Sequence, residues 1–581
     1  MSDFNNPQVK ALPAHLRRYI VGQHYDRYTP VDHAVWRYVM RQNYSCLKDV
    51  AYYPYIPGLK AAGLTIEKVP HLQEMNDALG KIGWGAVTVN GFIPPSAFME
   101  FQAYRVLVIA ADIRTLQHIE YTPAPDIIHE SAGHAPIIAD SGYNQYLCYF
   151  GSIGAKAMFS AQDFELYEAI RALSVIKEIP GAKPADIRKI EEMVAWKQQH
   201  MGQPSEMALL SRLHWWTVEY GLIGTLECPK IYGAGLLSSI GESASCMQPA
   251  IKKLPYTIDA INYPYDITKP QPQLFVTPTF QNLTDVLETF AGTMAFRRGG
   301  SYGLEKAVES RNTCTVVYSS GLQVSGTFLD FDDFWGQPVY IRAAGPAVLS
   351  YNGRQLKGHG KDYHHAGFSS PVGKLKDIAA PLEEHLVETG KHLHLHFESG
   401  IVVMGMVSSF LREQGRNLLI TFTDCTVMDR RGRILFGPYW GPYDLAVGEK
   451  IVSVFCGAAD KEAFEEKVHV PRAKINGAVH YDEQAMKLHN LYRQVRDARQ
   501  NKNGRADLQA LWECLQKDHS GDWLCALEIL ELAGGTTLAA AVRGFLEQKA
   551  MKQPEFKKLI RDGLDLIAQG PLPLLTDNLQ K

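Results

Sequence analysis

The sequence predicts a multi-domain protein: a mainly α-helical first part, then a β-rich domain, then a small α-helical C-terminal region. Its 581 residues suggest two to four domains. Apolar and polar residues alternate with period two from Cys314 to Cys456, which indicates strands. On both sides of this stretch, apolar residues recur at helical spacing. We therefore expect domains over residues 10–300, 310–460 and 470–581.

Composition excludes several classes of protein. The formal net charge of −3 gives no indication of a nucleic-acid partner or of binding to anionic membranes. No apolar run approaches the ~20 residues of a membrane span, and the N-terminus lacks a signal-peptide pattern. The nine cysteines are scattered without CxxC pairs, which predicts reduced thiols and a cytoplasmic location.

Three helices can be predicted in the first part of the chain. The segment YTPVDHAVWRYVMRQNY, residues 28–44, indicates a capped helix. The segment KPADIRKIEEMVAWKQQ, residues 183–199, has an amphipathic pattern. The segment TPTFQNLTDVLETFAGTMA, residues 277–295, is also helix-like.

The stretch YTPAPDIIHESAGHAPIIAD, residues 121–140, carries two histidines in an apolar run. His129 and His134 are five positions apart, about 140° on a regular helix. Both can face one metal ion only if the helix ends or carries a π-bulge between them, and Gly133 is the expected place. A zinc-protease HExxH motif is excluded, since Gly133 stands where its second histidine would be.

A carboxylate downstream completes a candidate metal site. In HWWTVEYGL, Glu219 lies among apolar residues of a helix that we expect to end at Gly221. A buried carboxylate is normally paired or bound to a metal, so a buried salt bridge is the alternative. With His129 and His134 it would form the two-histidine, one-carboxylate triad of non-haem Fe(II) oxygenases.

Three motifs then carry a family resemblance. TPAPDIIHESAGHAP, HWWTVEYGL and YGAGLLSSIGE, in this order, resemble the pterin-dependent aromatic amino acid hydroxylases, closest to the phenylalanine 4-hydroxylases. The resemblance covers about residues 10–300. It implies Fe(II) held by His129, His134 and Glu219, a tetrahydropterin of the tetrahydrobiopterin type, and O2 as cosubstrate.

The resemblance also implies catalytic and cofactor-binding residues. Glu130 would lie near the pterin and be reached through water, while Glu242 would orient a ligand histidine. Phe98 would stack on the pterin ring. The pterin-binding positions are Gly91, Ile93, Phe98 and Glu130.

A substrate pocket follows from the same resemblance. Arg114 would grip the amino acid carboxylate, a task that suits a bidentate guanidinium. The other substrate-binding positions are Tyr121, Thr122, Pro123, Trp215, Tyr220, Gly235 and Ser238.

The implied reaction is hydroxylation of an aromatic amino acid with O2, above all L-phenylalanine to L-tyrosine. The residues at Ile267 and Trp215 favour phenylalanine as the substrate. Hydroxylation of tryptophan or at another ring position is an alternative, as is a non-catalytic binding protein.

The sequence departs from the family at His214, where tyrosine is common, and in the spacing of the ligands. His129 and Glu219 are 90 positions apart (219 − 129), so we expect an insertion within residues 160–203.

The rest of the chain lies outside the resemblance. The β-rich domain is expected to be a sandwich or a barrel. His392, His394 and His396 share one strand face, where a second metal could bind, although a solvated face is favoured. The helical tail could cap the β-rich domain or bind a partner. It lacks sustained heptads, so a tetramerising coiled coil is not expected and a monomer or dimer is favoured.

Overall fold

The computed structural model describes residues 4–89, 93–120, 125–178, 183–265, 270–376, 380–464, 481–500 and 507–570. The chain forms two compact units. The first combines residues 1–150, 212–284 and 470–581, and the second combines residues 151–211 and 285–469. The three predicted segments therefore do not map one to one onto these units, because each unit is assembled from separated parts of the chain.

The helix α3 (Pro30–Val50) is the longest of the first unit among the described residues. Thr29 caps it: its side chain accepts from the Asp32 amide, and the Asp32 carboxylate accepts from the Thr29 amide. The capped helix predicted here is confirmed. The other described helices along the first half are α1 (Pro7–Lys10), α2 (Ala14–Arg17), α4 (Tyr55–Ala61), α5 (Leu72–Leu79), α6 (Pro95–Ala103), α7 (Ser141–Gly154), α10 (Glu206–His214), α11 (Ala234–Ser238), α12 (Glu242–Ser245) and α13 (Phe280–Ala291).

Two small sheets of the first unit were not predicted. One has the order β1-β2-β3 and the other β5-β4-β7-β6. Every residue of the parallel strands β2 and β3 is buried, so their sequences show no alternation of polar and apolar residues. The strands are β1 (Ile20–Val21), β2 (Gly85–Val89), β3 (Val106–Ala110), β4 (Leu222–Gly224), β5 (Pro229–Ile231), β6 (Lys252–Pro255) and β7 (Gln273–Thr277).

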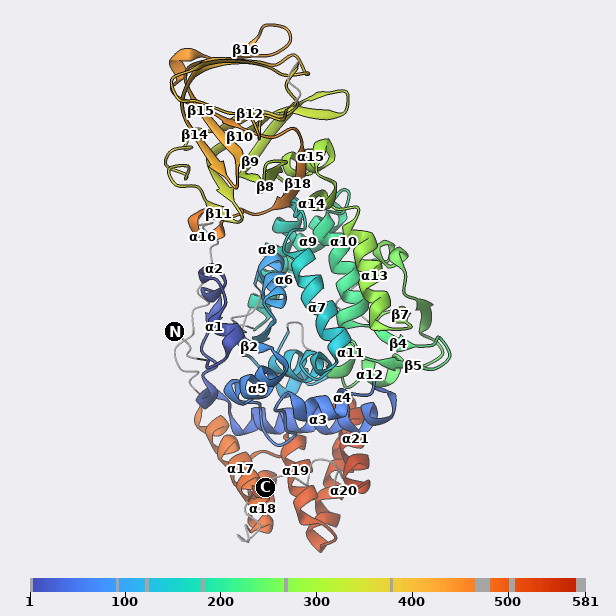
Figure 1. Ribbon diagram of the computed structural model, residues 1–581. Coiled ribbons are helices and arrows are strands. Elements are labelled where there is room, and N and C mark those ends of the chain that lie inside the picture. The colour runs from blue at the N-terminus through green and yellow to red at the C-terminus, as the bar shows by residue number, and fades with distance from the viewer. Residues whose placement is uncertain are drawn as a thin grey trace. The chain divides into compact units, whose positions relative to one another are not determined.

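The C-terminal helices belong to the first unit and pack on α3 (Figure 1). Arg37 of α3 forms ion pairs with Glu528 at 3.0 Å and Glu531 at 2.6 Å, and the Tyr38 hydroxyl donates to the Leu559 carbonyl. The tail thus contacts the helical part of the chain, which the sequence did not indicate. The described helices of the tail are α17 (Glu483–Gln500), α18 (Leu508–Asp518), α19 (Trp523–Ala533), α20 (Thr537–Lys552) and α21 (Lys557–Ala568).

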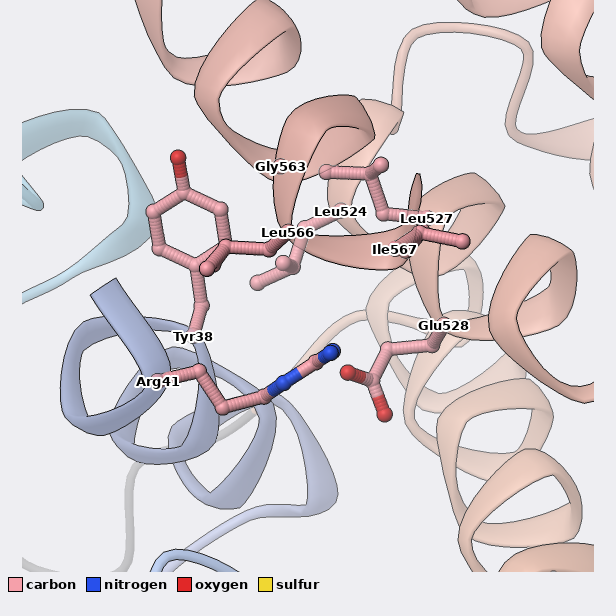
Figure 2. Close-up of a pocket in the computed structure, with 8 residues that line it drawn as sticks. All are labelled: Tyr38, Arg41, Leu524, Leu527, Glu528, Gly563, Leu566 and Ile567. Atoms are coloured by element: carbon pink, nitrogen blue, oxygen red, sulfur yellow. The ribbon is translucent and has the colours of Figure 1, made fainter. Parts of the chain in front are cut away.

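The contact between α3 and the tail is close-packed. A cavity of about 10 Å³ remains between α3, α19 and α21, which is room for about one water molecule. Figure 2 shows the Arg41 guanidinium directed toward Glu528 across this cavity. Apolar side chains of α19 and α21, among them Leu524 and Leu566, line the remaining wall.

The second unit contains the predicted β-rich domain as two antiparallel sheets. One has the order β11-β10-β9-β8-β18 with β12 paired to β10, and the other β13-β14-β15-β16 with β17 paired to β15. Side chains of both sheets share a buried core, which contains Val324, Leu349, Leu419 and Ala446. Of the two predicted architectures, this arrangement corresponds to a sandwich.

The strands of this domain are β8 (Thr313–Tyr318), β9 (Leu322–Phe334), β10 (Gln337–Tyr351), β11 (Arg354–Gln355), β12 (Gly367–Pro371), β13 (His392–His396), β14 (Val402–Glu413), β15 (Arg416–Met428), β16 (Ile434–Phe436), β17 (Tyr443–Ala446) and β18 (Ile451–Cys456). The helices of the second unit include α8 (Ala161–Glu178), α9 (Pro184–Gln199), α14 (Ala295–Arg298), α15 (Gly300–Ser310) and α16 (Lys461–Phe464). The amphipathic helix predicted over residues 183–199 is confirmed as α9.

Two further expectations concern metal and membrane. His392, His394 and His396 are all exposed along β13, and the described groups with metal-binding geometry do not include them. The favoured interpretation of a solvated strand face therefore holds. Among the described helices, none is both long and apolar enough to cross a membrane.

Candidate active site and metal centre

The two histidines of the first motif lie on a π-helix, η4 (His129–His134). Its i→i+5 hydrogen bonding brings residues five apart toward the same face, which a regular helix would not do. The rings of His129 and His134 lie edge to face with centroids 5.0 Å apart. The helix irregularity predicted between the two histidines is confirmed, and it spans the whole segment.

The helix α11 explains why glycine occurs in this π-helix. A Cβ atom at Gly133 would lie 2.6 Å from the Ala234 carbonyl oxygen of α11. In the same way, a Cβ atom at Gly235 of α11 would lie 3.1 Å from the Glu219 carbonyl oxygen. Small residues on both sides therefore let α11 contact both segments that carry the candidate ligands.

Glu219 lies on a second π-helix, η6 (Trp215–Glu219), which continues α10. The single helix predicted here therefore changes its hydrogen bonding after His214 and ends at Glu219, two residues before the expected Gly221. The change sets the carboxylate of Glu219 opposite the histidines of η4.

The three predicted ligands converge. Glu219 Oε2 lies 3.3 Å from His129 Nε2, and Glu219 Oε1 lies 3.3 Å from His134 Nε2. Burial alone would raise the pKa of Glu219, but the two imidazoles override it and hold that pKa well below its usual range. Ligand atoms 2.0–2.1 Å from one ion and at right angles are about 3 Å apart. The donor set therefore fits a divalent metal ion.

Ser238 fixes the ring of His129. The Ser238 hydroxyl donates to the Ala234 carbonyl at 2.8 Å, so its oxygen must accept from His129 Nδ1 at 3.0 Å. This leaves Nε2 of His129, which faces Glu219, as the nitrogen that would bind a metal ion. Ser238 therefore makes a hydrogen bond that orients His129, and the orienting role expected of Glu242 stays a prediction.

Glu242 has a different partner. Its Oε2 accepts a hydrogen bond from the Tyr220 hydroxyl at 2.7 Å, and burial raises its pKa. Glu242 thus contacts Tyr220, a residue that was predicted for the substrate pocket.

Glu130 is a second carboxylate beside the ligands. Its Oε2 lies 3.8 Å from His134 Nε2 and has no hydrogen-bond partner although it is buried. His129, Glu130 and His134 themselves have metal-binding geometry, so two carboxylates, Glu130 and Glu219, compete for the role of ligand. Glu219 contacts both imidazoles at the shorter distance, which favours it. Burial raises the pKa of Glu130 to about 8.

Arg114 lies next to the site, held by Asp126. Its Nε and Nη2 donate to the two carboxylate oxygens, each at 2.8 Å, and both side chains are almost fully buried. Burial alone would raise the pKa of Asp126, yet the guanidinium keeps it low. Asp126 also accepts from the His129 amide at 3.0 Å, so it links the predicted clamp to η4. Asp126 was not among the site residues predicted from the sequence.

An aromatic stack forms part of the site. The ring of Trp215 lies between those of Tyr220 and Tyr265, with centroids 4.6 and 4.4 Å away and nearly parallel planes. The buried Trp215 Nε1 has no hydrogen-bond partner. Trp215 and Tyr220 were both predicted for the substrate pocket, whereas Tyr265 was missed because no motif marks it.

His214 adds a third imidazole. Its Nδ1 lies 3.9 Å from Glu219 Oε1, and its ring meets those of Phe98 and Phe150 edge to face. Burial lowers the pKa of His214 to about 4, so the ring is neutral. Phe98, predicted to stack on the pterin, thus lies beside a position where this chain departs from the family pattern.

For the remaining predicted site residues the structure gives little or no information. Ile93 is half-buried just before α6. Gly91, Tyr121, Thr122, Pro123 and Ile267 lie outside the described residues.

A comparison with protein families matches this same half of the chain. The model described as biopterin-dependent aromatic amino acid hydroxylase covers residues 14–165 and 199–303. Over these matched residues the chain belongs to the biopterin-dependent aromatic amino acid hydroxylases. The unmatched residues 166–198 contain most of α8 and α9, so the expected insertion between the ligands lies there. The hydroxylase match ends before the β-rich domain.

Individual relatives agree with this assignment. The chain is 27% identical over 258 residues to phenylalanine-4-hydroxylase of Pseudomonas aeruginosa, covering 44% of this chain and 81% of that protein. It is 28% identical over 295 residues to the enzyme of Chromobacterium violaceum, covering 48% and 84%. A crystal structure of the latter enzyme with bound Fe(III) aligns with 26% identity and a TM-score of 0.38, over 49% of this chain and 90% of that chain.

Proposed function

We propose that the hydroxylase domain converts L-phenylalanine to L-tyrosine, using a ferrous ion, a tetrahydropterin and O2. His129, His134 and Glu219 would hold the iron. The observation that carries the proposal is the convergence of both Nε2 atoms on the Glu219 carboxylate at 3.3 Å. Imidazole and carboxylate are suitable ligands for Fe(II), and three protein ligands leave coordination positions open. When bound, the iron and the tetrahydropterin together supply the electrons that cleave O2, with one oxygen atom transferred to the ring.

The protein's part is to orient and enclose the reactants. Ser238 keeps the Nε2 lone pair of His129 available, and the neutral His214 closes one side of the site without adding charge. Glu130, buried with one carboxylate oxygen free, can hold a water or the pterin through a hydrogen bond. These buried side chains exclude bulk water from the reacting atoms.

The aromatic stack supports an aromatic substrate. Tyr220 and Tyr265 cover the two faces of Trp215, so a substrate phenyl ring would meet the rigid edge of this stack in an edge-to-face contact. Arg114 supports an amino acid, because the ion pair with Asp126 fixes its guanidinium close to η4. A phenyl ring and a carboxylate are the two groups that L-phenylalanine presents.

The test is product analysis with the purified full chain, ferrous iron, a tetrahydropterin and L-phenylalanine, L-tryptophan or L-tyrosine in parallel. We expect para-tyrosine from phenylalanine, at a kcat/KM well above that for tryptophan. Faster turnover of tryptophan, or hydroxylation at another ring position, would contradict the substrate assignment. If none of these amino acids supports oxidation of the pterin, the proposed activity itself is contradicted.

A further inference from the structure

The β-rich domain contains a second group of metal-binding side chains. His359, His364 and Asp444 each present a ligand atom, and these atoms lie within 4.8 Å of one another. The closest pair is His359 Nδ1 and His364 Nε2, 3.2 Å apart. This spacing matches the separation of about 3 Å between neighbouring ligands of one ion. No part of the hydroxylase domain contributes to the group.

The two histidines lie on a loop that backbone hydrogen bonds fasten to β10. The amide of Leu349 donates to the His359 carbonyl at 3.0 Å, and the amide of Ala347 donates to the His364 carbonyl at 3.1 Å. The loop also approaches Gly345, whose Cβ position would clash with the His365 carbonyl oxygen. The backbone at both histidines is therefore held by the sheet, independently of the contact between their rings.

Asp444 comes from the other sheet. It lies on β17, opposite Thr421 of β15, and the Thr421 hydroxyl donates to Asp444 Oδ1 at 2.6 Å. This bond orients the carboxylate, and the Tyr363 hydroxyl is a second hydrogen-bond partner of Asp444, which a bound ion would share or displace. Three donors from two sheets thus converge at one point.

The surroundings suit a bound cation. His364 and Asp444 are 6% and 7% exposed, so a carboxylate is buried beside two imidazoles. His359, the third member of the group, is half-buried. Tyr363, between the histidines in sequence, is 46% exposed, so the group lies near the surface.

We propose that His359, His364 and Asp444 bind one divalent transition-metal ion, which joins the loop of one sheet to β17 of the other. Two imidazoles and one carboxylate form a ligand set for borderline metals such as zinc or iron, with a fourth position left for water. The alternative is a hydrogen bond between the two rings with no metal. The two differ in whether removing one ring changes the metal content.

The experiment counts zinc in the untagged full chain carrying His134→Ala, so that the hydroxylase site does not contribute. After chelator treatment and dialysis against zinc, elemental analysis should give one equivalent per chain. Adding His364→Ala should reduce this to none, whereas adding His394→Ala, which removes an exposed histidine of β13, should leave it unchanged. Excess zinc should raise the melting temperature of the first protein by about 5 °C or more, without doing so for the His364→Ala protein.

Asp444→Asn guards against misfolding, because it removes the charge while keeping the shape and the contact with Thr421. We expect it to fold as judged by circular dichroism and to lose most of the zinc. Co²⁺ bound to the parent protein should give the visible absorption of a nitrogen- and oxygen-ligated ion, and Asp444→Asn should abolish it. The proposal would be overturned if the His134→Ala protein bound less than about 0.2 equivalents of zinc, or if its zinc content were equal with and without His364.

Discussion

Ser238 shows how one hydroxyl can determine the chemistry of a metal ligand. A serine hydroxyl has a single proton, and here it is donated to the Ala234 carbonyl within the same helix. The contact with His129 then runs from Nδ1–H to Oγ, so Nε2 is the nitrogen that faces Glu219 and would bind the ion. The sequence motif placed Ser238 among substrate-binding positions, and the structure gives it this additional contact.

We predict that Ser238→Ala weakens iron binding by about 10- to 100-fold, the usual effect of losing a hydrogen bond to a ligand histidine. The cause is the freedom that His129 gains to rotate and to change tautomer. Iron affinity is measured by competition with a chelator. Ser239→Ala is a suitable control, since the Ser239 side chain contacts only the Glu242 amide among the described residues. Equal iron affinity in Ser238→Ala and the parent protein would contradict the orienting role.

At the scale of elements, two π-helices and the short helix α11 build the site. Ordinary helices would turn His129 away from His134, whereas the π-helix η4 brings them to one side. The close approach of α11 requires glycine at position 133. The geometry of the ligands therefore depends on this helix contact.

We predict that Gly133→Ala destabilises the protein by about 1–3 kcal/mol, because the new methyl group would overlap the Ala234 carbonyl. Urea unfolding measures the change, and iron binding should weaken with it. Gly544→Ala is the matched control: this helical glycine of α20 has no atom within 4 Å of its Cβ position. It should stabilise the protein by about 0.5–1 kcal/mol. Similar unfolding free energies for the two variants would contradict the account of α11.

The sequence predicted the ligands better than their surroundings. His129 and His134 could be singled out as two histidines in one apolar run and Glu219 as a carboxylate in another, while the family resemblance assigned them to one metal. Asp126 and Tyr265 escaped prediction, since a single acid or aromatic residue carries no spacing signal. The strands β2 and β3 were missed because both their faces are buried. The His359–His364 pair was overlooked in favour of the more conspicuous HLHLH segment.

At the scale of the whole molecule, the C-terminal helices complete the unit that holds the hydroxylase site. Arg37, 6% exposed, pairs with Glu528 and Glu531 of α19, more than 490 positions away in sequence. Periodicity identified these helices but could not predict their partner, because ion pairs across such a separation leave no local pattern. The C-terminal helices therefore stabilise the unit that contains the hydroxylase site.

We predict that Arg37→Ala costs about 1.5–3 kcal/mol, because Glu528 and Glu531 lose charge-assisted hydrogen bonds to a buried guanidinium while Arg41 and Arg499 still pair with them. Denaturant unfolding of the full chain measures the loss, and limited proteolysis should show earlier cleavage of the tail. Lys558→Ala removes an exposed i,i+4 pair with Asp562 and should cost about 0.5 kcal/mol or less. An Arg37→Ala protein as stable as Lys558→Ala would show that the tail is not held through this cluster.

The assignment of Glu219 as the metal-binding carboxylate is tested most directly by iron analysis of two variants. Each carries His364→Ala, so that only the hydroxylase site is counted. We predict that Glu219→Ala loses its iron and its turnover, while Glu130→Ala retains iron close to one equivalent per chain, because Glu219 faces both imidazoles at 3.3 Å. Full iron in Glu219→Ala together with loss of iron in Glu130→Ala would contradict this assignment.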